Sequence, residues 1–232
     1  MDYHRFKSAV NRYLARHIGG DSRPVYYDID QYCPALHHLE AAYPAIRTEV
    51  ETLLNEHCDM PEYHVVNPPA KEISNTTAGR WNVFMLELLG YKLDDNLARC
   101  PETARVLERI PGKVQAFFSI LEPGKSVPRH EGPYLGYLRY HLGIKVPREN
   151  PPSIVVADQP YVWKEGEGVL FDDFWPHEVI NHSSEPRVVL IVDVYRPLPV
   201  LPNLVNHALL RTIAAPTYGK SVIRKAKAYA VH

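Results

Sequence analysis

Apolar side chains recur at helical spacing in the first half of the chain. After Pro34, which suits a first helical turn, they stand three or four positions apart. This stripe predicts an amphipathic helix that kinks at Pro44, because proline removes a backbone donor inside a helix. A shorter helix is expected to begin at Pro101 and to end before Pro111-Gly112. The residues of the stripe are Leu36, Leu39, Tyr43, Ile46, Val50 and Leu53.

The pattern changes after Val114 to short runs of β-branched and aromatic residues. Clusters of Pro, Gly, Asn and Asp separate these runs, and such residues form turns. Five or more strands at this spacing are typical of an all-β sandwich or barrel, and no interleaved helices of a parallel sheet are evident. We therefore expect a mainly β fold with flanking helices, in which helices from the first half pack on a barrel. The predicted strands are 114–121, 137–146, 153–157, 168–172 and 187–195.

We expect the helical and the strand-rich parts of the sequence to form one domain, because 232 residues is the size of one ordinary domain. Residues 1–112 are expected to be a mostly helical buttress and residues 113–197 the β-barrel core. Residues 198–232 are expected to form a basic helical tail, since they contain no acidic residue.

Composition and charge narrow the classes of function. Hydrophobic residues make up 45% and charged residues 23%, as in globular proteins, and a net charge of -1 argues against a general polyanion binder. Three scattered cysteines fit neither a disulfide scaffold nor a CxxC zinc site, which favours a reducing, cytoplasmic setting. The opening MDYHRFKSAVNRYLARH has no long apolar core, so neither a signal peptide nor an anchor is expected.

Two of the twelve histidines lie where a small barrel would hold a metal ion. His130 stands in the turn-like segment SVPRHEGPY, and His177 follows a strand end in FDDFWPHEV. Strand ends and loops project side chains into the mouth of a small barrel. Two histidines and one carboxylate with open positions form the non-haem Fe(II) oxygenase site. The usual His-x-Asp pattern is incomplete here, because the sequence reads His130-Glu131-Gly132.

Other polar residues of the predicted strands suit an anionic ligand. Arg187 opens the last strand and, pointing inward, could bind a dicarboxylate through two hydrogen bonds; a solvent-facing strand start is the alternative. Arg139 and His141 stand two apart and so share one face, where burial would require an anionic partner. Ser119 offers a hydroxyl, although such a group often only bonds backbone.

Two sequence blocks resemble the aspartyl/asparaginyl β-hydroxylase family, a branch of the Fe(II)/2-oxoglutarate dioxygenases that includes bacterial lipid A acyl-chain hydroxylases. They read SILEPGKSVPRHEGPYLGYLRYHLGIKVP and WKEGEGVLFDDFWPHEVINHSSEPRVVLIVDVYRP, and the resemblance runs from about Trp81 to Pro197. The segment GPYLGYLRYHL looks closer to the lipid A hydroxylases. The implied fold is a double-stranded β-helix, a cupin-like jelly-roll barrel with helices on one face.

The resemblance also implies roles for single residues. His130 and His177 would be the catalytic Fe(II) ligands, with Gly132 in the position of the usual carboxylate, as in the vertebrate-type enzymes. Arg187 would hold the distal carboxylate of the cosubstrate 2-oxoglutarate, and the implied reaction with O2 hydroxylates an unactivated C–H bond. Ser119, Arg139 and His141 would contact 2-oxoglutarate beside Arg187.

The sequence leaves the substrate and partners open. An aspartyl/asparaginyl β-hydroxylase-type reaction on an amino acid or peptide is the first expectation, and a lipid acyl chain is the alternative. The basic tail, with apolar residues such as Leu204, could lie on an anionic membrane surface, or its apolar residues could pack on the barrel. Nucleic acid is not expected, because only Tyr218 and Tyr229 could stack on bases there.

A cupin-type metal-binding module without 2-oxoglutarate chemistry is the alternative from another class. Such modules usually take three or four histidines from two compact motifs, whereas only His130 and His177 have suitable positions here. The oligomeric state is not predicted by the sequence.

Overall fold

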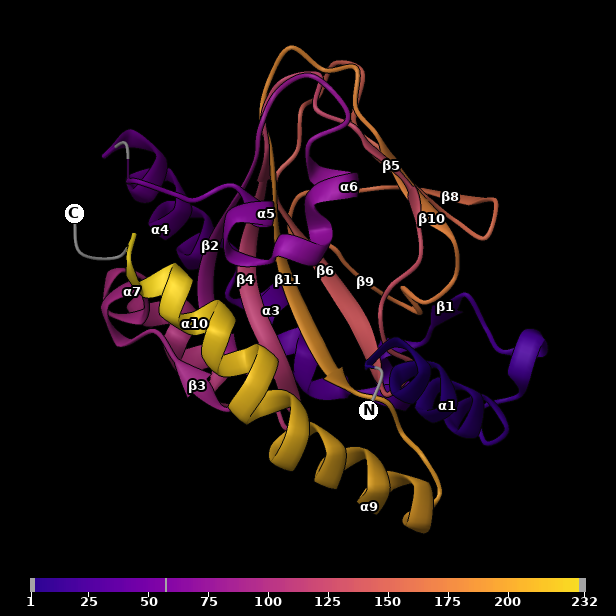
Figure 1. Cartoon of the computed structure of the whole chain (residues 1–232). Helices are drawn as coiled ribbons and strands as arrows, with labels where there is room; N and C mark the ends of the chain where they lie inside the picture. Colours follow the sequence, from indigo (N-terminus) through magenta and orange to yellow (C-terminus); the bar gives the residue numbers. More distant parts are fainter. Residues whose placement is uncertain (1–2, 57, 230–232) are drawn as a thin grey trace.

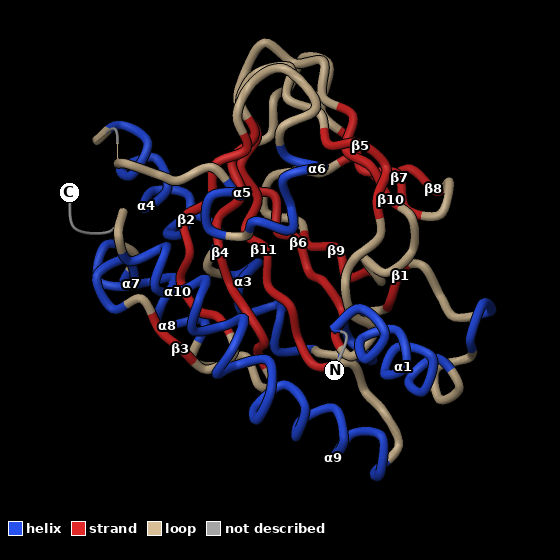
Figure 2. Tube along the Cα trace, in the orientation of Figure 1, coloured by secondary structure: helices blue, strands red, loops and turns tan. Residues whose placement is uncertain are grey.

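The computed structural model describes residues 3–56 and 58–229. Two antiparallel β-sheets form the centre of the molecule, and helices cover one of them (Figures 1 and 2). The larger sheet has seven strands in the order β1-β9-β6-β11-β4-β2-β3, and the smaller has four in the order β5-β10-β7-β8. The strands are β1 Tyr26–Tyr27, β2 Trp81–Leu88, β3 Tyr91–Lys92, β4 Lys113–Leu121, β5 Val127–His130, β6 Tyr137–Lys145, β7 Ser153–Val156, β8 Gln159–Val162, β9 Gly168–Phe171, β10 His177–Ile180 and β11 Arg187–Tyr195.

From β4 to β11 the chain passes back and forth between the two sheets. Strands β4, β6, β9 and β11 belong to the larger sheet, while β5, β7, β8 and β10 belong to the smaller one. This alternation is the strand order of a double-stranded β-helix, so the predicted fold class is confirmed. All five strands predicted from hydrophobic runs are present, as β4, β6, β7, β9 and β11.

Long strands of the larger sheet such as β4 and β11 divide their side chains between two apolar clusters, because successive residues point to opposite faces. On β4, Phe118 belongs to the cluster that includes the helices, and Phe117 belongs to the cluster shared with the smaller sheet. On β11, Leu190 and Ile191 divide in the same way. The space between the two sheets is therefore lined by the odd-numbered residues of β4 and β11.

Helices α3, α4, α7 and α8 cover the outer face of the larger sheet. The predicted stripe from Leu36 to Leu53 packs there, but the chain forms two helices that meet near Ala42, just before Pro44. The helices are α1 Tyr3–Ala15, α2 Ile29–Tyr32, α3 His37–Ala41, α4 Tyr43–Asn55, α5 Tyr63–Val66, α6 Lys71–Ser74, α7 Asp94–Arg99, α8 Pro101–Leu107, α9 Val200–Leu209 and α10 Lys220–Lys227.

The first 112 residues supply β1, β2 and β3 in addition to their helices. In the tail, a π-helical segment, Leu210–Gly219, connects α9 to α10. One expectation drawn from the sequence differs from the structure. His130 and His177 lie on strands β5 and β10 rather than in turns. Within residues 3–56 and 58–229, no helix has the length and apolar character needed to cross a bilayer.

Candidate functional site

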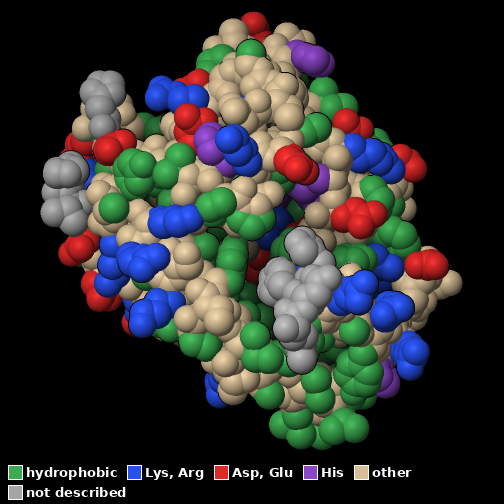
Figure 3. Space-filling view, viewed as in Figure 1, with side chains coloured by type: hydrophobic (Ala, Val, Ile, Leu, Met, Phe, Trp, Pro, Cys, Tyr) green, Lys and Arg blue, Asp and Glu red, His purple; other side chains and the backbone are tan. Residues whose placement is uncertain are grey.

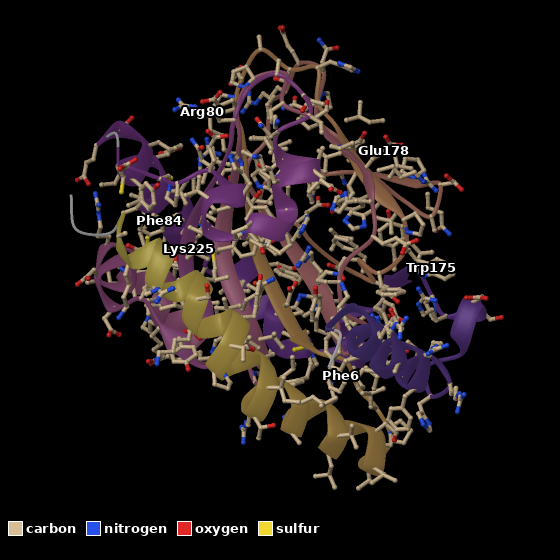
Figure 4. All side chains as sticks on the ribbon, viewed as in Figure 1. Phe6, Arg80, Phe84, Trp175, Glu178 and Lys225 are labelled. Carbon is tan, nitrogen blue, oxygen red and sulfur yellow. The ribbon has the colours of Figure 1, made fainter. Side chains whose placement is uncertain are left out.

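The two candidate metal ligands face each other across the smaller sheet. His130 is the last residue of β5, His177 is the first residue of β10, and the two are partners in the antiparallel register. Their ring centroids lie 4.2 Å apart, close enough for both imidazoles to contact one ion. Figure 4 marks Trp175 and Glu178, which lie on either side of His177 in the chain. The structure thus brings together the two histidines that the sequence singled out.

Backbone carbonyls orient both rings. The Nδ1 atom of His130 donates to the carbonyl of Pro128 at 2.8 Å, and the Nδ1 atom of His177 donates to the carbonyl of Trp175 at 2.8 Å. Donation from Nδ1 leaves the lone pair of each Nε2 atom for a ligand. Burial, and to a smaller extent the neighbouring His130, lower the pKa of His177 to about 3. Burial also lowers the pKa of His130, so both rings are neutral and suited to bind a cation.

Gly132 has no room for a side chain. A Cβ atom at this position would lie 2.5 Å from Cγ of Asp173 and 2.6 Å from its carboxylate oxygens. The backbone N–H of Gly132 also donates to the carbonyl of Asp173 at 2.7 Å. The carboxylate of Asp173 therefore fills the volume that a side chain at position 132 would need.

Asp173 is itself an unusual buried carboxylate. Its Oδ2 atom lies 2.9 Å from Nη1 of Arg139, and Oδ1 has no hydrogen-bond partner among the described residues. Burial raises the pKa of Asp173 to about 7, against the opposing effect of Arg139. Across the described ranges, no cluster of three or more His, Cys, Asp or Glu side chains is arranged to hold a metal ion.

Arg139 lies on the inner face as predicted, but carboxylates of the protein already bind it. Its Nε and Nη2 atoms each lie 2.8 Å from an oxygen of Asp193, and Nη1 is paired with Asp173. The anionic partner that its burial requires is thus a pair of buried aspartates. Sequence reasoning missed Asp193, although an acidic residue within the apolar run RVVLIVDVY was the signal that could have revealed it.

Arg187, His141 and Trp163 form a buried cluster with unsatisfied polar atoms. Nε and Nη1 of Arg187, both ring nitrogens of His141 and Nε1 of Trp163 are buried and have no hydrogen-bond partner in the part of the chain that the structure describes. The guanidinium carbon of Arg187 lies 4.5 Å from the ring centroid of Trp163. The ring centroids of Trp163 and His141 are 5.8 Å apart. Burial lowers the pKa of Arg187 to about 9.

Unsatisfied buried donors are costly, so this cluster is suited to an anionic ligand. The solvent-facing alternative for Arg187 is wrong, since the side chain is 2% exposed. Sequence reasoning missed Trp163, because it follows the largely exposed strand β8 and belongs to no periodic pattern. Ser119 lies on the same inner face, but its Oγ already accepts a hydrogen bond from Nε1 of Trp81 at 2.9 Å.

One aromatic ring separates the cluster from the histidine pair. The centroid of Phe171 lies 4.9 Å from that of His141 and 6.3 Å from that of His177. Along the inner face of β11, Arg187 therefore stands at one end and Asp193 with its partner Arg139 at the other. In Figure 3 the viewed face is hollowed near its centre, with His, Asp/Glu and Lys/Arg side chains around the hollow.

Comparisons with known proteins agree on one family. The sequence profile described as Aspartyl/Asparaginyl beta-hydroxylase matches residues 40–197. The chain is 42% identical over 188 residues to the ornithine lipid ester-linked acyl 2-hydroxylase of Rhizobium tropici, covering 81% of this chain and 66% of that protein. It is 34% identical over 170 residues to the mouse aspartate beta-hydroxylase domain-containing protein 2, covering 68% of this chain and 47% of that protein.

The human aspartyl/asparaginyl beta-hydroxylase is 36% identical over 124 residues, which cover 51% of this chain and 16% of that protein. The chain thus spans two thirds or less of the curated relatives that it matches. Among solved structures, the Schizosaccharomyces pombe Cnp3 cupin domain matches at 10% identity with a TM-score of 0.32, covering 41% of this chain and 62% of that one. A Bordetella pertussis cupin domain matches at 14% identity with a TM-score of 0.29, covering 35% of this chain and 81% of that one.

Proposed function

Because the chain belongs to the aspartyl/asparaginyl β-hydroxylase family, we propose that it is an Fe(II)- and 2-oxoglutarate-dependent dioxygenase acting on a lipid acyl chain. The observation that carries this proposal is the buried, unsatisfied Arg187 beside His141 on the larger sheet, with Phe171 between His141 and the histidine pair of the smaller sheet. A protein that only stored a metal ion would have no use for a buried guanidinium without a carboxylate partner.

The histidine pair fits a divalent iron. His130 and His177 would hold the ion through Nε2, since each Nδ1 atom is committed to a backbone carbonyl. A bound Fe(II) would supply the oxygen chemistry that cleaves an unactivated C–H bond. The protein would keep both rings in position through the carbonyls of Pro128 and Trp175, and the absence of a side chain at Gly132 would leave coordination positions open.

The unsatisfied cluster fits a small dicarboxylate. Arg187, whose Nε and Nη1 atoms are unpartnered, would bind one carboxylate through its guanidinium, and the indole of Trp163 would keep the guanidinium plane in place. His141 would donate to the same ligand, on the side where Phe171 lies between it and His177. Binding there would satisfy donors that are otherwise unpaired, so the ligand would gain both orientation and affinity.

Arg139 has a positioning role in this proposal rather than a direct contact with 2-oxoglutarate. Its three guanidinium nitrogens are committed to Asp173 and Asp193. Arg139 would thus hold the carboxylate of Asp173 against Gly132, beside the histidine pair. Ser119, which accepts from Trp81, would meet the cosubstrate only through its remaining lone pair and its own proton.

The substrate proposal rests on the relatives. The match to the ornithine lipid ester-linked acyl 2-hydroxylase is longer and more identical than the match to the human aspartyl/asparaginyl beta-hydroxylase. An acyl chain next to a polar head group is therefore our proposed substrate class, and an aspartyl or asparaginyl side chain is the second candidate. Succinate release, measured with an ester-linked acyl lipid and with an aspartyl peptide, distinguishes them.

The test of the cofactor assignment needs no substrate. Fe(II) and then 2-oxoglutarate are added to the protein without oxygen, and the visible charge-transfer band of the chelated centre is recorded. We expect a band that disappears in His130→Ala and is retained in the matched control His182→Ala, whose histidine is exposed after β10. Arg187→Met should need far more 2-oxoglutarate for the same band. A folded protein that binds Fe(II) without forming a band would contradict 2-oxoglutarate chemistry and favour a cupin-type metal module.

A further inference from the structure

The N-terminal end of α9 presents an apolar surface to solvent. Val200, Leu201 and Leu204 are 79%, 67% and 62% exposed, and these are the largest exposures among the large hydrophobic side chains of the described residues. They stand at positions i, i+1 and i+4, so they share one side of the helix. We call these three residues the α9 tip.

Basic side chains follow the α9 tip along the helical tail. The described residues that follow Arg196 include no Asp or Glu, and Arg211, Lys220, Arg224 and Lys227 are exposed along the continuation of α9 into α10. Helix α1 also lacks acidic residues and exposes Arg12 and other basic side chains. In Figure 3 the apolar patch at the bottom has Lys and Arg side chains over α10 on one side and over α1 on the other.

The inner sides of the same two helices hold the segment that follows His130. Asn206 of α9 donates to the carbonyl of Gly136 at 2.7 Å and accepts from the hydroxyl of Tyr134 at 2.6 Å. Asn11 of α1 donates to the carbonyl of Pro133 at 3.1 Å and accepts from the N–H of Leu135 at 3.1 Å. Helices α1 and α9 are therefore joined by direct hydrogen bonds to the chain segment that follows His130, and their outer sides remain available to a partner.

We propose that α9 and α1 dock the protein on an anionic lipid surface, with the α9 tip entering the head-group region. Exposed apolar side chains on a helical segment whose charged residues are all basic are the features of a peripheral membrane contact. A second copy fits this surface less well, because a symmetric contact would bring two basic surfaces together. The inference rests on the proposed function for its purpose, since docking would present lipid acyl chains to the site.

The test is co-sedimentation of the purified full-length chain with vesicles of phosphatidylcholine, with and without phosphatidylglycerol. We expect binding only to the vesicles that contain phosphatidylglycerol, and weaker binding as salt is raised. Leu201→Ser/Leu204→Ser should weaken binding at least about tenfold, since two exposed leucines supply the insertion. The matched control is Val162→Ser, because Val162 is also an exposed apolar residue, 45% exposed, but lies on β8 of the smaller sheet.

A second pair of variants tests the charge. Arg211→Gln/Arg224→Gln should lose most of the preference for phosphatidylglycerol, while Lys164→Gln should bind as the wild type does. Lys164 is an exposed lysine that pairs with Glu167 away from α9. Wild-type binding in both test variants, or no binding of the wild type to either vesicle, would overturn the proposal.

Two further readouts separate the outcomes. The oligomeric state of the wild type and of Leu201→Ser/Leu204→Ser is measured in solution. If the wild type is a dimer that does not bind vesicles and the variant is a monomer, the surface contacts a second copy and the lipid proposal is overturned. The anaerobic Fe(II)–2-oxoglutarate band is recorded for every variant. Lost vesicle binding with an intact band supports both proposals, whereas variant-sensitive vesicle binding without a band supports the lipid surface and contradicts the proposed function.

Discussion

Replacing Arg187 by methionine should make the ligand-free protein more stable. The Arg187 side chain is buried, two of its nitrogens have no partner within the described ranges, and burial lowers its pKa well below the usual value of a guanidinium, to about 9. At about 1.4 kcal/mol for each pKa step, keeping the guanidinium charged inside the protein costs about 5 kcal/mol. Methionine has a similar length and no charge, so it removes this cost.

Two losses offset part of the gain. The contact between the guanidinium and the Trp163 ring, 4.5 Å away, is worth about 1–2 kcal/mol, and imperfect packing of the smaller side chain costs about 1 kcal/mol more. We therefore expect Arg187→Met to raise the free energy of unfolding by about 2 kcal/mol. For a chain of this size, that gain corresponds to a rise in Tm of roughly 4–8 °C.

The assay is urea and thermal unfolding of the two proteins, without ligand and with Fe(II) plus 2-oxoglutarate under anaerobic conditions. With Fe(II) alone as the reference, adding 2-oxoglutarate should stabilise the wild type by about 3 kcal/mol at a hundredfold excess over Kd and should leave Arg187→Met nearly unchanged. Arg105→Met is the control, since Arg105 forms only an exposed pair with Glu102 and should change stability little.

The pH dependence of the difference provides an internal check. Because burial lowers the pKa of Arg187 to about 9, the folded chain gives up this proton at a lower pH than the unfolded chain, so wild-type stability relative to the variant rises with pH above about pH 9. The advantage of Arg187→Met should therefore shrink above about pH 9. An Arg187→Met protein that is less stable than the wild type at neutral pH, or that 2-oxoglutarate stabilises equally, would refute the reasoning.

Other predictions follow from single contacts. Gly132→Ala should destabilise the fold by about 1–3 kcal/mol in urea unfolding, because its Cβ would lie 2.5 Å from Cγ of Asp173; wild-type stability would contradict the packing described here. Cys100 is fully buried and burial raises its thiol pKa to about 12, so mass spectrometry after iodoacetamide treatment at pH 8 should find it unmodified while Cys58 reacts first. Modification of Cys100 before Cys58 in the folded protein would contradict this order.

Much of the fold was predictable, because strands with long apolar runs carry their own signal. Among the missed strands, β2 (Trp81–Leu88) is buried along almost its whole length, so it lacks the alternation that distinguishes a half-buried strand from a helix. β5 and β10 contain only four residues each; both include a histidine, and β5 also has a proline, so they resemble turn sequence. Their strand character comes from pairing, of β5 with β10 and of β10 with β7, which no local pattern reports.

The candidate site was predictable where one residue carried the signal. His130, His177 and Arg187 were found from strand ends, and the structure places all three on the inner side. The pairing of Arg139 with Asp173 and Asp193 was not found, because it joins residues from three segments that only the closed barrel brings together. A sequence shows that a buried arginine needs an anion, but it does not show whether that anion is a ligand or a neighbouring side chain.

The edge position of β5 has a consequence for how the molecule opens. β5 is an edge strand that pairs with β10 through two residue pairs, with an irregularity between them. The paired residues are far apart in the sequence: His177 follows His130 by 47 residues. Such a strand is among the first to separate in local unfolding, because few hydrogen bonds hold it and its closure joins distant parts of the chain. An ion shared by His130 and His177 would link β5 to β10 at this edge. Hydrogen exchange at the amides of β5 would therefore report occupancy of the site: it should slow when the ion is bound. The amides of β11 should stay protected with and without the ion.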